Sequence, residues 1–447
     1  MDERVIRGGI VVLPGGPARV DIRVRAGRIA QVEPDLDAAG AEVVDAEGRH
    51  VLAGAIDTHG HQWEPGFTSP PDFSDASASA AVGGVTTFLD HPLTPPVVLD
   101  RRGLEAKAAL GAATSLIDFG LHGGASPGSL DELHGLWAAG ATGIKVFTCP
   151  TGTALDGFSD PARLDELFVR LGAIGARTLV HAEDAEVLDA ARSILEAAGT
   201  TAPADFPRWH NLEAEIRAVD RVLELAGRHR VQVVIVHASH PSIVEAVRAA
   251  RVRGVDAFVE TCPHYLHLTG EDLDALGPWA MSAPPVRDRA GRAGLLTMLR
   301  DGTIDVIGSD HCAIGRPGKA VEDMTRIIPG VPGLDIFLPL LLDLVAAGAL
   351  TWEALARATS ARPARLFGFA RKGAIEAGKD ADLAFVDPDR AWVVRAANLP
   401  SSAGWSPYEG RTLRGAVTET WSRGVPVARD GQPIGRPGHG RFVARAE

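Results

Sequence analysis

Several residues with metal-binding side chains stand at the ends of short apolar runs in this 447-residue sequence. His59 and His61 close the run GAIDTHGH. Two positions apart on a strand, their side chains would point the same way. Two imidazoles on one face are good ligands for a divalent transition metal. A chance pair is the alternative, and the strand-like run with Asp57 before the pair favours the metal interpretation.

Lys145 lies inside another apolar run, GIKVFTC, where a cation is costly to bury. Its amine could extend to solvent, pair with an acid, or react in its neutral form with carbon dioxide to give a carbamate. A carbamate carries a negative charge and two oxygens, so it could bridge two metal ions. The histidines at the ends of the other runs favour the carbamate.

Three more apolar runs end near a polar residue with ligand chemistry, namely His181, His237 and Asp310. Taken alone, each histidine is better explained as a hydrogen-bonded core or rim residue, and Asp310 has the alternative of a helix N-cap. Together with the residues above, they favour a site for two divalent metal ions. An aspartate there can also hold a proton from an attacking water, so Asp310 is the expected catalytic residue. The predicted ligand set is His59, His61, Lys145, His181, His237 and Asp310.

Eight short β-rich runs carry these residues, and segments with helical patterns separate them. Most of the runs are continuously apolar, which is typical of parallel strands buried on both faces. Strand–helix alternation of this kind predicts an α/β protein with a (β/α)8 TIM barrel over residues 54–370. Active sites of such barrels lie at the C-terminal ends of the strands, so the predicted ligand set can converge there. The runs are 54–61, 84–91, 115–123, 143–149, 177–184, 231–239, 255–264 and 304–311.

The two ends of the chain have a different pattern. Residues 1–53 and 371–447 contain short, partly alternating strands with glycine turns, which is typical of antiparallel sheet. We expect these two segments to form one small β-sandwich domain beside the barrel. The chain length suits one barrel plus such a smaller unit.

Composition and charge limit the partners. The net charge of −12 disfavours nucleic acid and anionic membranes as partners, and no apolar run approaches the length that crosses a bilayer. The N-terminal residues lack the pattern of a signal peptide. Cys149, Cys262 and Cys312 form no CxxC pair, so we expect no disulfide framework and a cytoplasmic location.

At this point the motifs resemble one family, the cyclic amidohydrolases, which comprise allantoinases, hydantoinases or dihydropyrimidinases, and dihydroorotases. The resemblance implies the same barrel and terminal sandwich, two divalent metal ions with zinc as the expected metal, and carboxylation of Lys145. It implies that a metal-bridging hydroxide opens a cyclic amide, and that the chain forms a homodimer or homotetramer. The motifs are LAGAIDTHGHQWEPG, GIKVFTCPTG, LVHAED, IVHAS, ETCPHYL, SAPPVR, GSDH and KGAIEAGKDADLAFVDP.

The identity of the ring depends on residues near these motifs. Dihydroorotases carry an arginine where this chain has Trp63, and hydantoinases a tyrosine where it has Pro150. KVFTCPTG resembles the allantoinase motif, although allantoinases usually have arginine where this chain has Phe67. Trp63 and Phe67 could line an apolar pocket or simply pack in a loop. The resemblance therefore favours a cyclic ureide such as allantoin, with 5-substituted hydantoins and dihydroorotate as alternatives.

Three further residues are candidates for contact with the substrate. They are His264 in CPHY, and Ala283 and Arg287 in SAPPVRD. For Arg287 a structural ion pair is the alternative. Two functions from other classes also remain, a catalytically silent scaffold protein and a single-metal deaminase. The intact ligand set argues against the scaffold, and Lys145 argues against the deaminase.

Overall fold

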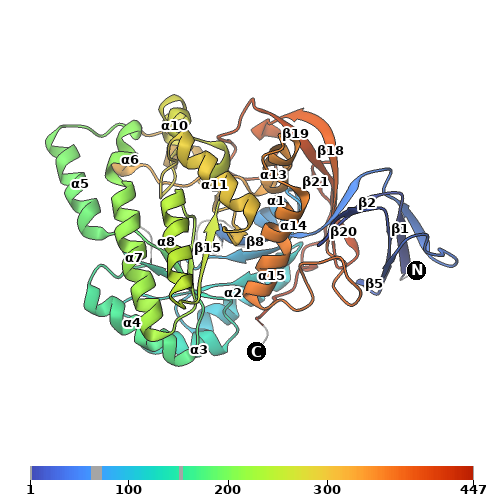
Figure 1. Ribbon diagram of the computed structural model, residues 1–447, viewed down its shortest axis with the longest axis horizontal. Helices are drawn as coiled ribbons and strands as arrows, with labels where there is room; N and C mark the ends of the chain where they lie inside the picture. Colours follow the sequence, from blue (N-terminus) through green and yellow to red (C-terminus); the bar gives the residue numbers. More distant parts are fainter. Residues whose placement is uncertain (1–2, 62–72, 151–154, 446–447) are drawn as a thin grey trace.

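The computed structural model describes residues 3–61, 73–150 and 155–445. A ring of parallel strands surrounded by helices occupies one end of the molecule, and sheets built from both chain ends occupy the other (Figure 1). Trp63 and Phe67, predicted to line a pocket or pack in a loop, lie outside the described residues.

Parallel strands form a closed barrel. Their hydrogen-bonded orders are β10-β9-β8-β17 and β11-β12-β13-β14-β15-β16, and all of these pairs are parallel. The two groups of strands join into one ring at two places. β10 and β11 come from one predicted run, and β16 and β17 come from another. The barrel and its eight runs are therefore confirmed. The strands are β8 (Ala55–His61), β9 (Val85–Asp90), β10 (Asp118–Leu121), β11 (Gly123–Gly124), β12 (Ile144–Phe147), β13 (Thr178–His181), β14 (Val233–Ile235), β15 (Ala257–Thr261), β16 (Val306–Ile307) and β17 (His311–Cys312).

Helices connect the strands and cover the barrel (Figure 1). Polar side chains start several of them by accepting a backbone N–H, as Asp184 does for α5 and Asn211 for α7. Asp310 does not cap a helix, because β17 follows it directly. Among the described residues, no helix combines the length and apolar character needed to cross a membrane. The helices are α1 (Ser74–Val82), α2 (Arg101–Thr114), α3 (Leu133–Ala138), α4 (Pro161–Ile174), α5 (Ala185–Ala197), α6 (Phe206–Trp209), α7 (Leu212–His229), α8 (Pro241–Val252), α9 (Pro263–His267), α10 (Gly270–Leu276), α11 (Arg289–Asp301), α12 (Arg316–Lys319), α13 (Phe337–Ala346), α14 (Trp352–Ala356) and α15 (Arg362–Phe367).

Two further sheets lie outside the barrel. The order β5-β4-β1-β6 is built from the N-terminal segment, and the order β21-β20-β19-β18-β7-β2-β3 is built from both chain ends. β7 pairs with β18, which joins the two ends of the chain, and Ile22, Phe385 and Trp421 belong to one apolar cluster within them. The strands are β1 (Glu3–Arg7), β2 (Ile10–Leu13), β3 (Gly16–Ala18), β4 (Asp21–Arg25), β5 (Arg28–Glu33), β6 (Glu42–Asp45), β7 (His50–Ala53), β18 (Leu383–Val393), β19 (Thr412–Ser422), β20 (Val425–Arg429) and β21 (Gln432–Pro433).

The terminal strands pair mostly antiparallel, as expected, but two pairings differ from the expectation. β1 pairs with β6, and β2 with β7, in parallel. The reason is that the chain passes from one sheet to the other twice, from β1 into β2 and from β6 into β7. These two passages run side by side in the same direction, so both of their pairings are parallel. The domain boundaries themselves stay a prediction.

A buried ionic cluster joins the barrel to the terminal strands. The Nζ of Lys372 lies 2.7 Å from Asp118 Oδ2 at the start of β10 and 2.6 Å from Asp382 Oδ2 just before β18. Arg423, which follows β19, also contacts Asp118. All four side chains are buried. The cluster is thus a polar link between segments that are distant in the sequence.

We predict that Lys372→Met destabilises the protein by about 3–5 kcal/mol, because it leaves two buried carboxylates without their shared cation. Urea unfolding followed by circular dichroism would measure this. The matched control is Lys379→Met, which removes only an exposed hydrogen bond to the carbonyl of Ala370 and should cost less than about 1 kcal/mol. Equal effects of the two substitutions would contradict a special role for the cluster.

Candidate active site

The ends of the barrel strands bring the predicted ligand set together. His59 and His61 lie at the end of β8, His181 ends β13, and His237 follows β14 by two residues. Asp310 lies between β16 and β17. These five side chains are all buried, although they come from four different parts of the sequence.

His59, His61 and Asp310 form the first of two groups. The Nε2 of His61 lies 3.1 Å from Asp310 Oδ1, and the Nε2 of His59 lies 3.4 Å from the same oxygen. Behind the group, the Nδ1 of His59 lies 2.7 Å from the carboxylate of Glu260, which is wholly buried in β15. An Nδ1–H that donates to Glu260 leaves the lone pair on Nε2, the nitrogen that faces Asp310.

His181 and His237 form the second group. The Nδ1 of His181 lies 3.0 Å from the Nε2 of His237. The Nε2 of His181 lies 2.8 Å from Glu183, and Glu183 in turn accepts from the Nδ1 of His210 at 2.9 Å. The ring centroids of His59 and His237 lie 5.4 Å apart, so the two groups adjoin.

Lys145 lies in β12 with only 1% of its surface exposed. Its Nζ is 4.9 Å from the centre of the Phe147 ring, and the described residues give that nitrogen no hydrogen bond or ion pair. Burial lowers the pKa of Lys145 to about 8. Burial also lowers the pKa of His59 and of His237, and the nearby Lys145 lowers both further. A neutral amine is the form that reacts with carbon dioxide.

Tight backbone geometry holds the two groups. His237 and Asp310 adopt left-handed backbone conformations, with φ of 41° and 49°, which non-glycine residues rarely do. Ser309 donates to both oxygens of Asp57 at 2.7 Å, through its backbone N–H and its hydroxyl, and so ties the strand of His59 to Asp310. A Cβ at Gly308 would lie 2.5 Å from that of His59, so this position has no room for a side chain.

Sequence reasoning missed four residues of this region, Glu183, Glu260, His91 and His210. Glu183 stands two positions after His181, and Glu260 lies within a predicted strand, so their places in the motifs were available as signals. His91 ends the second predicted run, and its ring stacks on that of His59 with centroids 3.7 Å apart. His210 precedes α7 and carries no comparable signal.

The predicted substrate-contacting residues have different surroundings. His264 is buried, and one of its ring nitrogens lies within 4.8 Å of ligand atoms of Cys262 and Asp310. Pro150 is exposed, and Ala283 is half-buried. The guanidinium of Arg287 pairs with Glu215 at 3.1 Å and donates to the hydroxyl of Ser239 at 3.0 Å. These contacts are those expected of a structural ion pair. Contact of Arg287 with a substrate stays a prediction.

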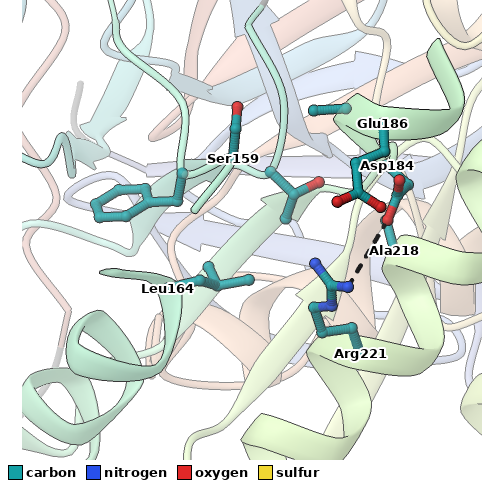
Figure 2. Close-up of a pocket in the computed structure, with 9 residues that line it drawn as sticks. Ser159, Leu164, Asp184, Glu186, Ala218 and Arg221 are labelled. Carbon is teal, nitrogen blue, oxygen red and sulfur yellow. Dashed lines mark ion pairs between the residues drawn. The ribbon is translucent and has the colours of Figure 1, made fainter. Parts of the chain in front are cut away.

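A small pocket lies beside the second group (Figure 2). Thr148, whose hydroxyl donates to the carbonyl of Glu183 at 2.8 Å, is one of its lining residues. Asp184 and Arg221 lie 4.0 Å apart across it, and Phe158 and Leu164 supply apolar surface. No member of the predicted ligand set lines this pocket, so it is separate from the two groups.

Residues 50–427 match the model of the amidohydrolase family, and the chain belongs to that family. It is 39% identical over 441 residues to an allantoinase of Rubrobacter xylanophilus, with 98% of this chain and 97% of that protein covered. It is 37% identical to a dihydroorotase of Halobacterium salinarum, covering 96% and 99% of the two chains. Its structure is similar to that of the L-hydantoinase (dihydropyrimidinase) from Arthrobacter aurescens, with a TM-score of 0.94, 31% identity and full coverage of both chains.

The lowered pKa of Lys145 predicts a pH effect on the stability of the metal-free protein. Between pH 8 and 10.5 the unfolded chain binds the lysine proton and the folded chain does not, so this residue makes folding more favourable as the pH rises. Relative to Lys145→Met, the free energy of unfolding of the unsubstituted protein should increase by up to about 3 kcal/mol over this window. Urea unfolding of chelator-treated protein would measure it, and a constant difference between the two proteins would contradict a buried neutral amine.

Proposed function

We propose that this protein is a metal-dependent cyclic amidohydrolase that opens the ring of a cyclic ureide, with allantoin as the favoured substrate. The observation that carries the proposal is the arrangement of two adjoining groups of buried ligand atoms at the ends of the barrel strands. Lys145, a buried lysine with a lowered pKa, lies close enough to affect both groups. The family match and the three similar proteins support it.

The residues fit two divalent metal ions. His59 Nε2, which lies 3.4 Å from Asp310 Oδ1, is buried without a hydrogen-bond partner among the described residues. Such an orphaned nitrogen is costly unless something binds in the region. His59, His61 and Asp310 would hold a first ion, His181 and His237 would hold a second, and the carbamate of Lys145 would supply an oxygen ligand to each. Zinc suits this set of imidazole and carboxylate ligands.

Bound cations of this kind would polarise the ring carbonyl and lower the pKa of the attacking water. Within the chain, Asp310 accepts the proton of that water and delivers it to the ring nitrogen as the amide bond breaks. Asp310 suits this role because its carboxylate lies 3.1 Å from the Nε2 of His61 and beside His264. The buried surroundings strengthen the electrostatic interactions on which the step depends.

A hydantoinase is the second candidate. The structural similarity to the L-hydantoinase from Arthrobacter aurescens favours it, as does the apolar character of Trp63 and Phe67, which suits a substituted ring. We also propose that residues 1–53 and 371–447 form a β-sandwich domain and that the protein is a cytoplasmic homodimer or homotetramer.

The proposal is tested by measuring metal content and hydrolysis together. Purified protein loaded with zinc should bind about two ions per chain and hydrolyse allantoin or a hydantoin. About one ion per chain would indicate a single-metal deaminase, and none would indicate a scaffold protein. A screen of allantoin, 5-substituted hydantoins, dihydrouracil and dihydroorotate would identify the ring.

Lys145→Ala should reduce kcat by at least about 1,000-fold, because the bridge between the two metal ions is lost and metal binding weakens. A small carboxylic acid added to the assay should restore part of the activity by taking the place of the carbamate. Lys379→Ala, which changes a half-buried lysine that donates only to the carbonyl of Ala370, is the matched control and should retain activity. Full activity of Lys145→Ala would refute the bridged two-metal site.

We predict that kcat/KM for allantoin or a hydantoin exceeds that for dihydroorotate by at least about tenfold, or ~1.4 kcal/mol. A carboxylate in a partly dry pocket needs a cation, and Trp63 offers one N–H donor and a ring face in place of the expected arginine. The net charge of −12 adds repulsion of anions. If dihydroorotate is the better substrate, the ranking of the subfamilies is wrong while the class of enzyme stands.

A further inference from the structure

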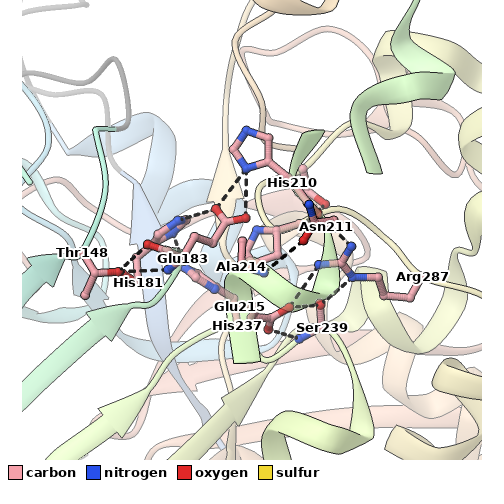
Figure 3. A network of polar contacts seen from close by, with 12 residues as sticks. Thr148, His181, Glu183, His210, Asn211, Ala214, Glu215, His237, Ser239 and Arg287 are labelled. Carbon is pink, nitrogen blue, oxygen red and sulfur yellow. Dashed lines mark hydrogen bonds and ion pairs between the residues drawn. The ribbon is translucent and has the colours of Figure 1, made fainter. Parts of the chain in front are cut away.

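Behind the second group of ligands, a chain of polar contacts extends from His181 to Arg287 (Figure 3). Glu183 accepts from the Nε2 of His181 at 2.8 Å and from the Nδ1 of His210 at 2.9 Å. The side chain of Glu183 is wholly buried. The buried carboxylate of Glu183, which is not part of the predicted ligand set, thus lies between two imidazoles that can donate to it.

The chain of contacts continues from His210 to the segment that follows β14. The carbonyl of His210 accepts from the Nη1 of Arg287 at 2.8 Å, and the Nε of Arg287 donates to the hydroxyl of Ser239 at 3.0 Å. Ser239 lies two residues beyond His237. The chain of contacts therefore begins at one ligand of the second group and ends beside the other.

The contact with Glu183 decides which nitrogen of His181 carries its proton. A carboxylate accepts hydrogen bonds, so the proton is on Nε2 and the lone pair is on Nδ1. Nδ1 is the atom that lies 3.0 Å from the Nε2 of His237. With the opposite tautomer, the protonated nitrogen would face His237 and could not bind a metal ion.

We propose that Glu183 is a positioning residue for the second metal ion and that His210 holds Glu183 in place. This inference rests on the proposed function, because it concerns one half of the proposed two-metal site. Glu183 fixes the tautomer and the ring orientation of His181, and His210 fixes both oxygens of Glu183, at 2.9 and 3.0 Å. The first group has no contact with this pair and depends on Glu260 instead.

The experiment is a zinc titration of the full-length, chelator-treated protein with its unsubstituted form and three variants. Glu183→Gln keeps the size of the side chain and removes its charge. We expect this variant to bind one zinc ion as the unsubstituted protein does and to bind the second 10- to 100-fold more weakly. Glu186→Gln, an exposed glutamate three residues further along that pairs with Arg217, is the matched control and should bind both ions normally.

His210→Ala is the third variant and covers the case in which Glu183→Gln does not fold. His210 is partly exposed, so its removal leaves the barrel core intact, and we expect about a threefold to tenfold weaker second ion. Normal affinity for both ions in a folded Glu183→Gln or His210→Ala protein would overturn the inference. Fewer than two ions bound by the unsubstituted protein would instead overturn the proposed two-metal site.

A double-mutant cycle separates positioning from general destabilisation. In a His181→Asn background the imidazole that Glu183 positions is absent, so adding Glu183→Gln should weaken zinc binding no further. A further loss of affinity in the double variant would show that Glu183 acts other than through His181, and would overturn its role as the positioning residue of that imidazole.

Discussion

The burial of one amine in the barrel wall is the constraint on which the candidate site depends. Lys145 is surrounded by strands, and a charged ammonium there has no carboxylate within ion-pair distance among the described residues. Such a charge is expensive in a medium of low polarity, so burial favours the neutral amine and lowers its pKa to about 8. A neutral amine can become a carbamate, and a buried carbamate requires cations near it. The imidazoles of His59 and His237 on either side would hold those cations.

The closed parallel barrel is what makes this arrangement possible. Each strand ends at the same rim, so residues from distant parts of the sequence meet there without long loops. Strand register also positions the site. Lys145 pairs with Leu179, two residues before the end of β13 at His181, while His61 ends β8. The hydrogen bond from Ser309 to Asp57 fixes the position of Asp310 at the C-terminal ends of the strands. A shift of one residue would turn each of these side chains to the other face of its strand.

The extent to which the sequence predicted this structure follows from how local each signal is. The eight barrel strands were predicted, and the ligand set was proposed, because apolar runs and the residues at their ends are local patterns. The parallel pairing of β1 with β6 depends on the path of the chain between two sheets, which no local pattern contains. Glu260 was missed for a related reason, because its partner His59 is distant in the sequence. Glu183 was missed although its partner His181 is only two residues away. His210, 27 residues from Glu183, gave no signal at all.

The carboxylates behind the histidines differ in a way that bears on function. Glu260 belongs to a barrel strand and is wholly buried, so the nitrogen that His59 presents is fixed by a strand of the barrel itself. Glu183 lies after its strand, and the residue that holds it, His210, belongs to the segment before α7 and is partly exposed. A displacement of that segment would therefore change the position of His181 through one buried carboxylate. The described residues provide no comparable chain of contacts from an outer segment to His59. Of the two proposed metal positions, the second is thus the one whose geometry depends on the outer segments of the barrel.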